Sequence, residues 1–202
     1  MSDPASATLH EAYGRRGALP PDIRALDRSM RVFGTAFTVA TSIGDNLWLH
    51  RALACAPAGS VLVVATATGP WRDAAGAYGY WGALMTTAAR RRGLGGLVID
   101  GHVRDARAIP ACGLPVFSRG VCVRGTTKDS RSPGALAEPV RIGDVSIATG
   151  DLVVGDTDGV VVIAADEAAA VLERAERMAE KEAELIDRIR RGATTLDLLG
   201  LE

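Results

Sequence analysis

The chain has 202 residues, enough for one domain with a sizeable hydrophobic core, and its 23 basic and 24 acidic residues give a formal net charge of −1. This balance argues against a general nucleic-acid-binding protein, which normally has a basic excess. The apolar runs are too short to cross a membrane, and residues 1–9 lack the basic-then-apolar pattern of a secretory signal. The three cysteines, Cys55, Cys112 and Cys122, show no CxxC spacing, so we expect reduced thiols in a cytoplasmic protein without a zinc site.

The first third of the chain predicts alternating helices and strands. Residues 1–7 should form a frayed terminus. Asp45 is a suitable N-cap for a helix, and the β-branched run VFGTAFTVA is typical of a strand. The predicted order up to residue 65 is a short helix (9–16), a strand (32–40), a helix (45–56) and a strand (61–65).

The stretch GYWGALMTTAARRRGLGGLVIDGHVRD (79–105) predicts a loop, an amphipathic helix, a glycine-rich turn, a short strand and a polar loop. Gly93 suits the left-handed residue that ends a helix. Residues 97–99 predict a buried strand, and Asp100-Gly101 is a turn dipeptide. One helical stripe carries the apolar side chains expected in the core, which are Trp81, Leu84, Met85, Ala88 and Ala89.

The remainder of the chain predicts short strands followed by one long helix. Asp158-Gly159 is a strong hairpin signal before the strand at 160–163, and residues 126–138 should form a mobile loop. Asp166 is the expected N-cap of a C-terminal helix that runs to Arg191 (166–191), and we see no linker that would divide residues 1–202 into domains. The other predicted strands are 114–117, 121–123, 140–142, 145–147 and 152–154. The pattern indicates a mixed α/β fold.

Two kinds of chemical group should converge at one end of the stretch 79–105. The first is the set of free backbone N–H groups near Gly82, Ala83 and Leu84, where a helix begins. The second is the pair Arg104-Asp105. Arginine grips carboxylates in a fork and aspartate binds hard divalent cations, so this combination suits a metal-bound oxyacid.

Four segments together resemble one known family: GDNLWLHRALACAPAGSVLVV (44–64), residues 79–105, GLPVFSRG (113–120) and TGDLVVGDTDGVVVI (149–163). This is the family of metal-dependent class II pyruvate aldolases that act on 4-hydroxy-4-methyl-2-oxoglutarate, which also contains the regulator of ribonuclease activity A. The resemblance covers nearly the whole chain. It implies a compact β/β/α domain with a long C-terminal helix, assembled as a homotrimer or hexamer with active sites between subunits.

The resemblance also implies roles for individual residues. Arg104 would be catalytic, holding the carboxylate of a small 2-oxo acid substrate and stabilising its enolate. Asp105 would be the only direct protein ligand of Mg²⁺ or Mn²⁺. The backbone of Gly82, Ala83, Leu84 and Met85 would bind the oxygens of the substrate. A glutamate from the C-terminal helix of a neighbouring subunit would lie nearby, and Glu180, Glu182 and Glu184 are all candidates.

Ala83 departs from the family pattern, in which the aldolases have an acidic residue at this position. That carboxylate would orient a water that shuttles the proton of the substrate's hydroxyl, and an alanine cannot do so. Aldol cleavage needs such a base, whereas decarboxylation of an oxaloacetate-type substrate does not. His102 is an alternative acid or base, although a lone loop histidine is more often simply solvated. Arg104-Asp105 could likewise be an ordinary surface ion pair.

Two functions of different classes remain open from the sequence. The first is a divalent-metal-dependent carbon–carbon lyase, an aldolase or decarboxylase that forms a pyruvate-type enolate. The second is a non-catalytic regulator that binds a ribonuclease or another protein. The regulator branch tends to keep the acid at position 83 and to lose the aspartate of the R-D pair, and this chain has the opposite pattern. Metal dependence would separate the two functions.

Overall fold

Parallel strands form the middle of the main sheet in the computed structural model, which describes residues 4–66 and 77–201. Among these residues the sheet has nine strands, with the order β1-β6-β5-β3-β2-β10-β11, while β4 pairs with β5 and β7 with β2. Its strands are β1 (Arg24–Ala25), β2 (Val32–Thr41), β3 (Val61–Thr66), β4 (Gly79–Trp81), β5 (Gly96–Val103), β6 (Val116–Val121), β7 (Gly134–Leu136), β10 (Leu152–Gly155) and β11 (Val160–Ile163). A separate antiparallel pair consists of β8 (Val140–Ile142) and β9 (Val145–Ile147).

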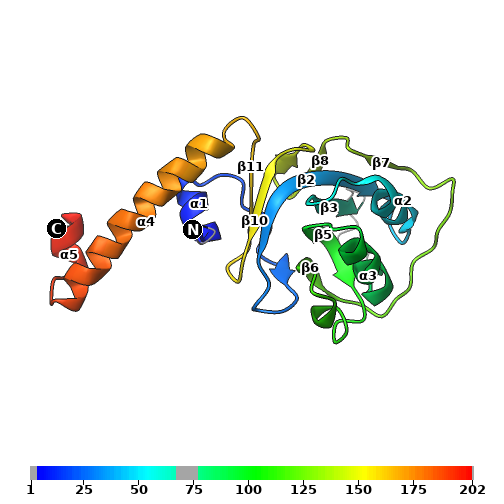
Figure 1. Ribbon diagram of the computed structural model, residues 1–202, viewed down its shortest axis with the longest axis horizontal. Coiled ribbons are helices and arrows are strands. Elements are labelled where there is room, and N and C mark those ends of the chain that lie inside the picture. The colour runs from blue at the N-terminus through cyan, green and yellow to red at the C-terminus, as the bar shows by residue number, and fades with distance from the viewer. Residues whose placement is uncertain (1–3, 67–76, 202) are drawn as a thin grey trace.

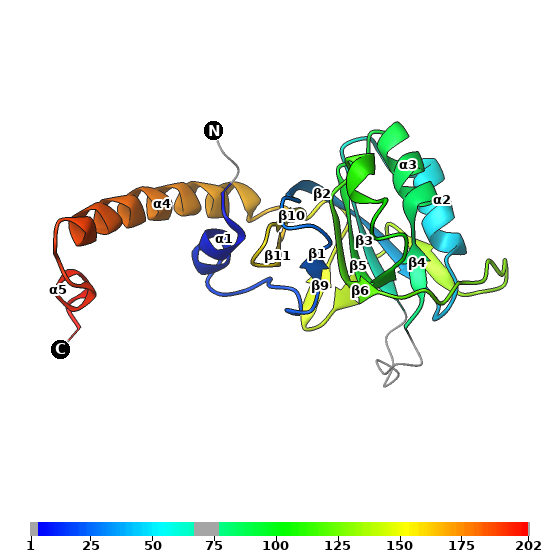
Figure 2. The same ribbon diagram turned by 90° about the horizontal axis from the view of Figure 1, so that it is seen from below.

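Helical crossovers connect the parallel strands, as parallel pairing requires. Helix α2 (Leu47–Cys55) follows β2, α3 (Ala83–Arg91) follows β4, and a short 3-10 helix (Pro110–Cys112) lies between β5 and β6. Helices α2 and α3 lie side by side against the sheet (Figures 1 and 2). Strands β3 and β5 are buried along almost their whole length, which explains why both are near-continuous apolar runs in the sequence.

Three helices form an arm that extends from the sheet (Figures 1 and 2): α1 (Ser6–Ala12), α4 (Ala168–Arg190) and α5 (Thr195–Leu199). The arm packs on the hairpin formed by β10 and β11, whose alternate side chains face two different cores. The main core receives Val153, Val160 and Val162. The smaller core, shared with α1 and α4, receives Leu152, Val154, Val161 and Ile163. No helix within the described residues is both long and apolar enough to cross a membrane.

The strands at 32–40 and 61–65 and the hairpin at Asp158-Gly159 are confirmed, but the turn predicted at Asp100-Gly101 is wrong. Strand β5 continues through both residues to Val103, because it is paired with β3, β4 and β6. Pairing with neighbours therefore overrides the local turn preference of the dipeptide.

Three further strand predictions need correction. Strand β6 is one continuous strand where two were expected, because Ser118 and Gly120 continue the pairing with β5, with a register shift between them. The expected mobile loop 126–138 contains β7, which pairs with the end of β2. Residues 79–81, expected as a loop, form the buried strand β4, which pairs with the end of β5 at His102 and Val103.

The helix ends also differ from expectation. Helix α1 begins at Ser6, inside the segment expected to fray, because Asp156 accepts hydrogen bonds from the Ser6 N–H (2.8 Å) and hydroxyl (2.6 Å). The N-cap residue of α2 is Asn46, and Asp45 caps from one residue earlier by accepting the Leu47 N–H (2.9 Å). Helix α4 begins two residues after Asp166, whose side chain is not its cap.

The apolar stripe expected along the C-terminal helix packs only in part. Val171 and Ala175 are buried against α1, whereas the side chains of Ile186 and Ile189 are 42% and 41% exposed. Ile186 and Ile189 of the far half of α4 are therefore largely uncovered.

Candidate functional site

The first turn of α3 is the starting point of the candidate site. The Ala83 N–H donates to Asp105 Oδ2 (3.0 Å), and the Thr86 N–H begins the helical pattern by donating to Gly82 O (3.0 Å). The N–H groups of Leu84 and Met85 lie between these two and have no acceptor within the helix. They are available to an anionic group, which the positive end of the helix dipole also favours.

Arg104 and Asp105 come to this turn from the end of β5. The Arg104 N–H donates to Trp81 O (2.8 Å), which extends the pairing of β5 with β4 by one residue. Asp105 then takes a left-handed backbone conformation (φ 58°), which non-glycine residues rarely adopt and which aspartate tolerates better than most. Its carbonyl starts the next turn by accepting the Ala108 N–H (2.8 Å). The chain reverses here, and the Asp105 carboxylate faces the start of α3.

Two glycines allow these segments to approach so closely. A Cβ on Gly82 would lie 2.5 Å from Asp105 Oδ2 and 3.3 Å from Arg104 Nε. A Cβ on Gly79 would lie 2.4 Å from the carbonyl oxygen of Cys122 and 3.1 Å from Arg104 Cβ. Any side chain at Gly82 would therefore displace the carboxylate or the guanidinium, so the arrangement of Arg104 and Asp105 depends on this glycine.

A third segment borders Arg104 from the loop after β6. The Gly79 N–H donates to the carbonyl of Arg124 (2.8 Å), and the guanidinium carbon of Arg124 lies 5.1 Å from the centre of the Tyr78 ring. A Cβ on Gly125 would be 3.7 Å from Arg104 Nη1. Arg104 thus lies between the start of α3 and residues 124–125.

The structure brings Gly82, Ala83, Arg104 and Asp105 together, and Met85 is buried beneath them. Leu84 departs from expectation, because its side chain is 75% exposed and does not belong to the core. Only its backbone N–H can belong to the site. Among the described residues there is no group of three or more His, Cys, Asp or Glu side chains that could hold a metal ion. Asp105 Oδ1 accepts no hydrogen bond from this part of the chain, so that one oxygen is available to a cation.

Asp100 lies on β5 in an ion-paired cluster rather than in a turn. Its buried carboxylate accepts from Arg119 Nε, and Nη1 of the same arginine donates to the exposed carboxylate of Asp22. Burial opposes the charge on Arg119, but its hydrogen bonds and ion pairs with Asp100 and Asp22 outweigh this and raise the pKa of the guanidinium. The pairing explains how an aspartate can occupy a buried strand position.

His102 lies on β5 two residues before Arg104 and is partly buried. Burial, together with the positive charge of Arg119, lowers the pKa of His102, while Asp22 acts in the opposite direction. This shift favours the neutral form of the ring. Its Nδ1 is buried and has no hydrogen-bond partner within the described part of the chain, so no protein group there fixes its tautomer for acid–base work.

The candidate glutamates of the C-terminal helix lie far from this site within one chain. Glu180, Glu182 and Glu184 are exposed on α4. Figures 1 and 2 show α4 extending away from the part of the molecule that holds β5 and α3. None of the three can reach Arg104 of its own chain.

Residues 44–46 contact the segments that carry the site, and the sequence alone assigned them no role in it, only a helix N-cap at Asp45. The Asn46 side-chain amide donates to Tyr80 O (2.8 Å), and the Gly44 N–H donates to the Tyr80 hydroxyl (3.0 Å). The only signal in the sequence is their place inside the segment 44–64, whose resemblance to the family named no role for them.

The comparisons with known proteins agree with one another. A family model described as RraA-like, Aldolase/RraA, matches residues 5–162. A protein of Halalkalibacterium halodurans, provisionally named a 4-hydroxy-4-methyl-2-oxoglutarate aldolase, is 35% identical over 159 residues, which make up 79% of this chain and 72% of that protein.

Two solved structures also match the chain. The first is an uncharacterized protein from Pseudomonas syringae pv. tomato, with a TM-score of 0.80 and 31% identity over 95% of this chain and 87% of that one. The second is RraAS2 from Streptomyces coelicolor, described as an unusual member of the RNase ES inhibitor RraA protein family, with a TM-score of 0.71 and 28% identity over 94% of this chain and 92% of that one. The chain belongs to the RraA-like (Aldolase/RraA) family.

Proposed function

We propose that this protein is a divalent-metal-dependent carbon–carbon lyase that forms the enolate of pyruvate or of a related 2-oxo acid. The observation that carries the proposal is the contact of the Asp105 carboxylate with the first turn of α3, across Gly82 and beside Arg104. A carboxylate, a guanidinium and free backbone N–H groups thus lie close together. The relative that is provisionally named an aldolase supports the same class of reaction.

The residues fit a metal ion that has one protein ligand. Asp105 Oδ2 is held by the Ala83 N–H, and Oδ1 is left for a cation. Substrate oxygens and water would complete the shell of Mg²⁺ or Mn²⁺, which commonly keep several waters in such sites. What the ion would supply at Asp105 is Lewis acidity towards the 2-oxo and carboxylate oxygens of the substrate.

The protein groups would bind and orient the substrate around that ion. Arg104 would form a bidentate pair with the 2-oxo acid's carboxylate and stabilise negative charge on the enolate oxygen. The N–H groups of Leu84 and Met85 would donate to substrate oxygens at the positive end of α3. The backbone contribution is fixed before the substrate arrives, because these N–H groups belong to the first turn of a helix.

Ala83 determines which bond cleavage these groups can support. Its methyl group can neither accept nor donate a proton, so the side chain at position 83 cannot take the hydroxyl proton in an aldol cleavage. Loss of CO₂ from an oxaloacetate-type substrate needs only stabilisation of the enolate. We therefore propose that decarboxylation is favoured over cleavage of 4-hydroxy-4-methyl-2-oxoglutarate.

The test is pyruvate release from a panel of 2-oxo acids with Mg²⁺ or Mn²⁺, repeated with a chelator. We expect release from at least one substrate, and its loss with the chelator. Arg104→Lys should lose most of that activity, because an ammonium group cannot form the fork of a guanidinium. Arg107→Lys is a matched control, since Arg107 is exposed three residues away. Equal turnover of both variants would contradict the role of Arg104.

The second candidate is a non-catalytic regulator of a ribonuclease. The similarity to the Streptomyces RraAS2 structure favours it, as does the exposed apolar surface on the far half of α4. Such a regulator should bind its partner equally well with and without a chelator. Retained partner binding together with no metal-dependent pyruvate release from any substrate would favour this second function.

A further inference from the structure

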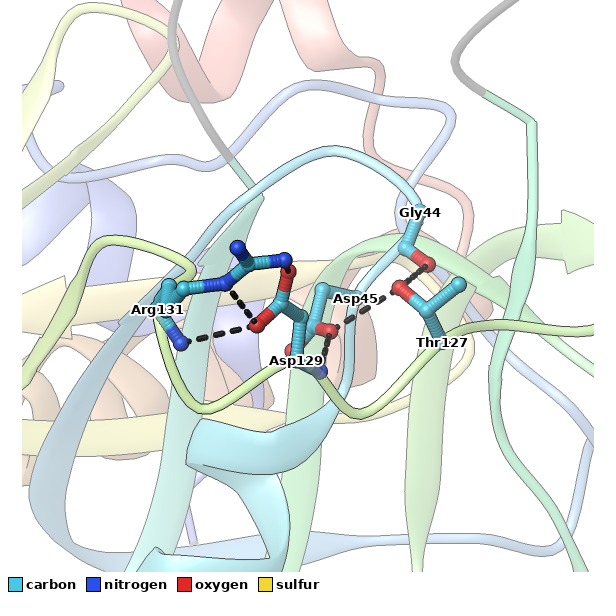
Figure 3. A network of polar contacts seen from close by, with 5 residues as sticks. All are labelled: Gly44, Asp45, Thr127, Asp129 and Arg131. Carbon is cyan, nitrogen blue, oxygen red and sulfur yellow. Dashed lines mark hydrogen bonds and ion pairs between the residues drawn. The ribbon is translucent and has the colours of Figure 1, made fainter.

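The turn formed by Gly44, Asp45 and Asn46, hereafter the 44–46 bracket, holds a loop on one of its sides (Figure 3). Asp45 Oδ2 accepts hydrogen bonds from the Thr127 hydroxyl (2.9 Å) and from the Asp129 N–H (2.6 Å). The backbone adds two more, from the Thr127 N–H to Gly44 O (2.8 Å) and from the Asn46 N–H to Thr127 O (3.1 Å). The Thr127 hydroxyl also lies 3.1 Å from Gly44 O. Residues 127–129 are thus attached to the bracket by five hydrogen-bond contacts.

Two of the same three residues, Gly44 and Asn46, also hold β4. Asn46 Nδ2 donates to Tyr80 O (2.8 Å) and contacts Met85 Sδ (3.6 Å). The Gly44 N–H donates to the Tyr80 hydroxyl (3.0 Å). Tyr80 is only two residues before Gly82, and Met85 is in the first turn of α3. The bracket therefore contacts the segment whose N–H groups face Arg104 and Asp105.

These two attachments lead to two segments that both border Arg104. One leads through Tyr80 to the first turn of α3, and the other leads from Thr127 back to Gly125, whose position borders the Arg104 guanidinium. A buried turn that binds both segments fixes their separation. None of its side chains has to touch a substrate for this effect.

Burial makes the bracket stiff. The side chains of Asp45 and Asn46 are 1% and 3% exposed. Burial by itself disfavours the charge on Asp45, but the N–H groups of Asp129 and Leu47 and the Thr127 hydroxyl together lower the pKa of this carboxyl below its ordinary value. A buried carboxylate with three donors holds each of them more strongly than a neutral acceptor would.

We propose that Asp45 and Asn46 are positioning residues that couple the loop 124–129 to the first turn of α3 and so set the width of the site around Arg104. The catalytic part of this inference rests on the proposed lyase function. The structural coupling between the loop and the first turn of α3 does not rest on that function, because it can be measured in the protein without metal or substrate.

The decisive variant is Asp45→Asn, which keeps one carbonyl oxygen for the Leu47 N–H and replaces the acceptor of Thr127 and Asp129 by an NH₂ group. Hydrogen exchange of the Thr86 and Arg104 amides should accelerate by ~10-fold or more, the loss expected for a buried hydrogen bond that is worth over 1 kcal/mol. Asp45 touches neither amide, so acceleration there that exceeds the acceleration of the buried amides of β3 must pass through the bracket rather than through a general loss of stability. Acceleration confined to Thr127 and Asp129 would overturn the proposal.

The reciprocal variant is Tyr80→Phe, which removes the acceptor of the Gly44 N–H on the other side. Exchange of the Thr127 and Asp129 amides should then accelerate, although Tyr80 contacts neither. Arg131→Gln is the matched control, because it removes only the pair with Asp129 at the surface, where the Arg131 side chain is 89% exposed. If Asp45→Asn does not fold, Thr127→Val removes one of the same hydrogen bonds and takes its place.

Activity provides a separate measurement. With a substrate that the wild type converts, Asp45→Asn should lower kcat by ~10-fold or more and leave the affinity for Mn²⁺ unchanged, because Asp105 keeps its contacts. A wild type without any pyruvate release would refute the proposed function but leave the exchange result standing. Full activity of the variant together with purely local exchange changes would refute the positioning role alone.

Discussion

The sheet and the arm differ in how far their apolar side chains are buried within one chain. In the sheet, strands β3 and β5 are covered on all sides by their own chain, and Val61, Leu97 and Ile99 have no exposed surface. In the arm, only the first two turns of α4 are covered, and the residues further along are exposed, including Met178, Ile186 and Ile189. The centre of the sheet is therefore buried within one chain. The arm, in contrast, has an apolar surface that another copy of the chain could cover.

The largest expected effect is on the site carried by the sheet. Asp105→Asn should abolish binding of Mn²⁺ and with it the metal-dependent activity, because a neutral amide is a weak ligand for a hard cation. The fold should persist, since the residue is exposed and makes one side-chain hydrogen bond. Calorimetric titration with Mn²⁺ measures the loss of metal binding, and thermal unfolding measures whether the fold persists. Unchanged Mn²⁺ affinity would remove Asp105 as the ligand.

Ala83→Asp should have the next largest effect, and it is a gain. The new carboxylate would be next to Arg104 and could restore the relay that takes a hydroxyl proton, a contribution of typically ~10²–10⁴-fold for a general base. Cleavage of 4-hydroxy-4-methyl-2-oxoglutarate should rise by such a factor, and decarboxylation of oxaloacetate should change much less. Side-by-side kinetics on both substrates measure this. Efficient aldol cleavage by the wild type would mean that another residue supplies the base.

A pair of matched truncations tests the difference between sheet and arm directly. Ile99→Ala removes a fully buried side chain from β5 and should lower the free energy of unfolding by about 2–5 kcal/mol. Ile186→Ala on α4 should change the free energy of unfolding of an isolated protomer by only about 0.5 kcal/mol or less. Denaturant titration of both variants, under conditions in which each is monomeric, measures the contrast.

The same Ile186→Ala variant should instead weaken self-association, which we expect to give a trimer or hexamer. Sedimentation over a range of concentrations would show the shift towards the 21.0 kDa monomer. A wild type that is monomeric at every concentration would contradict the assignment of the arm to an interface between copies.

The smallest effect concerns the junction of sheet and arm, where Asp156 accepts both hydrogen bonds of Ser6. Burial opposes the charge, but the hydrogen bonds from Ser6 and Asp158 lower the pKa of Asp156 below its ordinary value of 3.8. Because the folded-state pKa is depressed, the stabilisation is present above the ordinary pKa and is lost as the pH falls through the folded value. Docking of α1 should loosen only in strong acid, and in Asp156→Asn this pH dependence should disappear. Hydrogen exchange of residues 6–12 at low pH measures both.

The sequence predicts the fold well wherever local pattern and tertiary pairing agree. The strands at 32–40 and 61–65 and the hairpin at Asp158-Gly159 are of this kind. The turn predicted at Asp100-Gly101 is wrong, because the dipeptide expresses only a local preference. The pairing of β5 with its neighbours depends on distant parts of the chain and overrides it. The burial predicted for Leu84 is also wrong. An apolar side chain suggests burial, but at this position in the first turn of α3 the side chain points outward.

The candidate site is predictable as a set of residues but not as a geometry. The spacing from Gly82 to Asp105 indicates that the two ends of the stretch meet, and they do. No pattern in the sequence indicates that the missing Cβ of Gly82 is what lets Asp105 approach, or that Asn46 supports Tyr80 from a distant part of the chain. Such contacts depend on the packing of segments that are remote in sequence.

The hairpin of β10 and β11 has a consequence for how the chain folds. Its odd and even positions serve two different hydrophobic cores, so a slip of one residue in its register would present each core with the side chains meant for the other. The register is thus specified twice over. The arm's own core also cannot close until this hairpin has formed and joined β2. Helices α1 and α4 should therefore pack onto the protein late in folding, after β10 and β11 have formed. The arm should also be the first part to detach when unfolding begins.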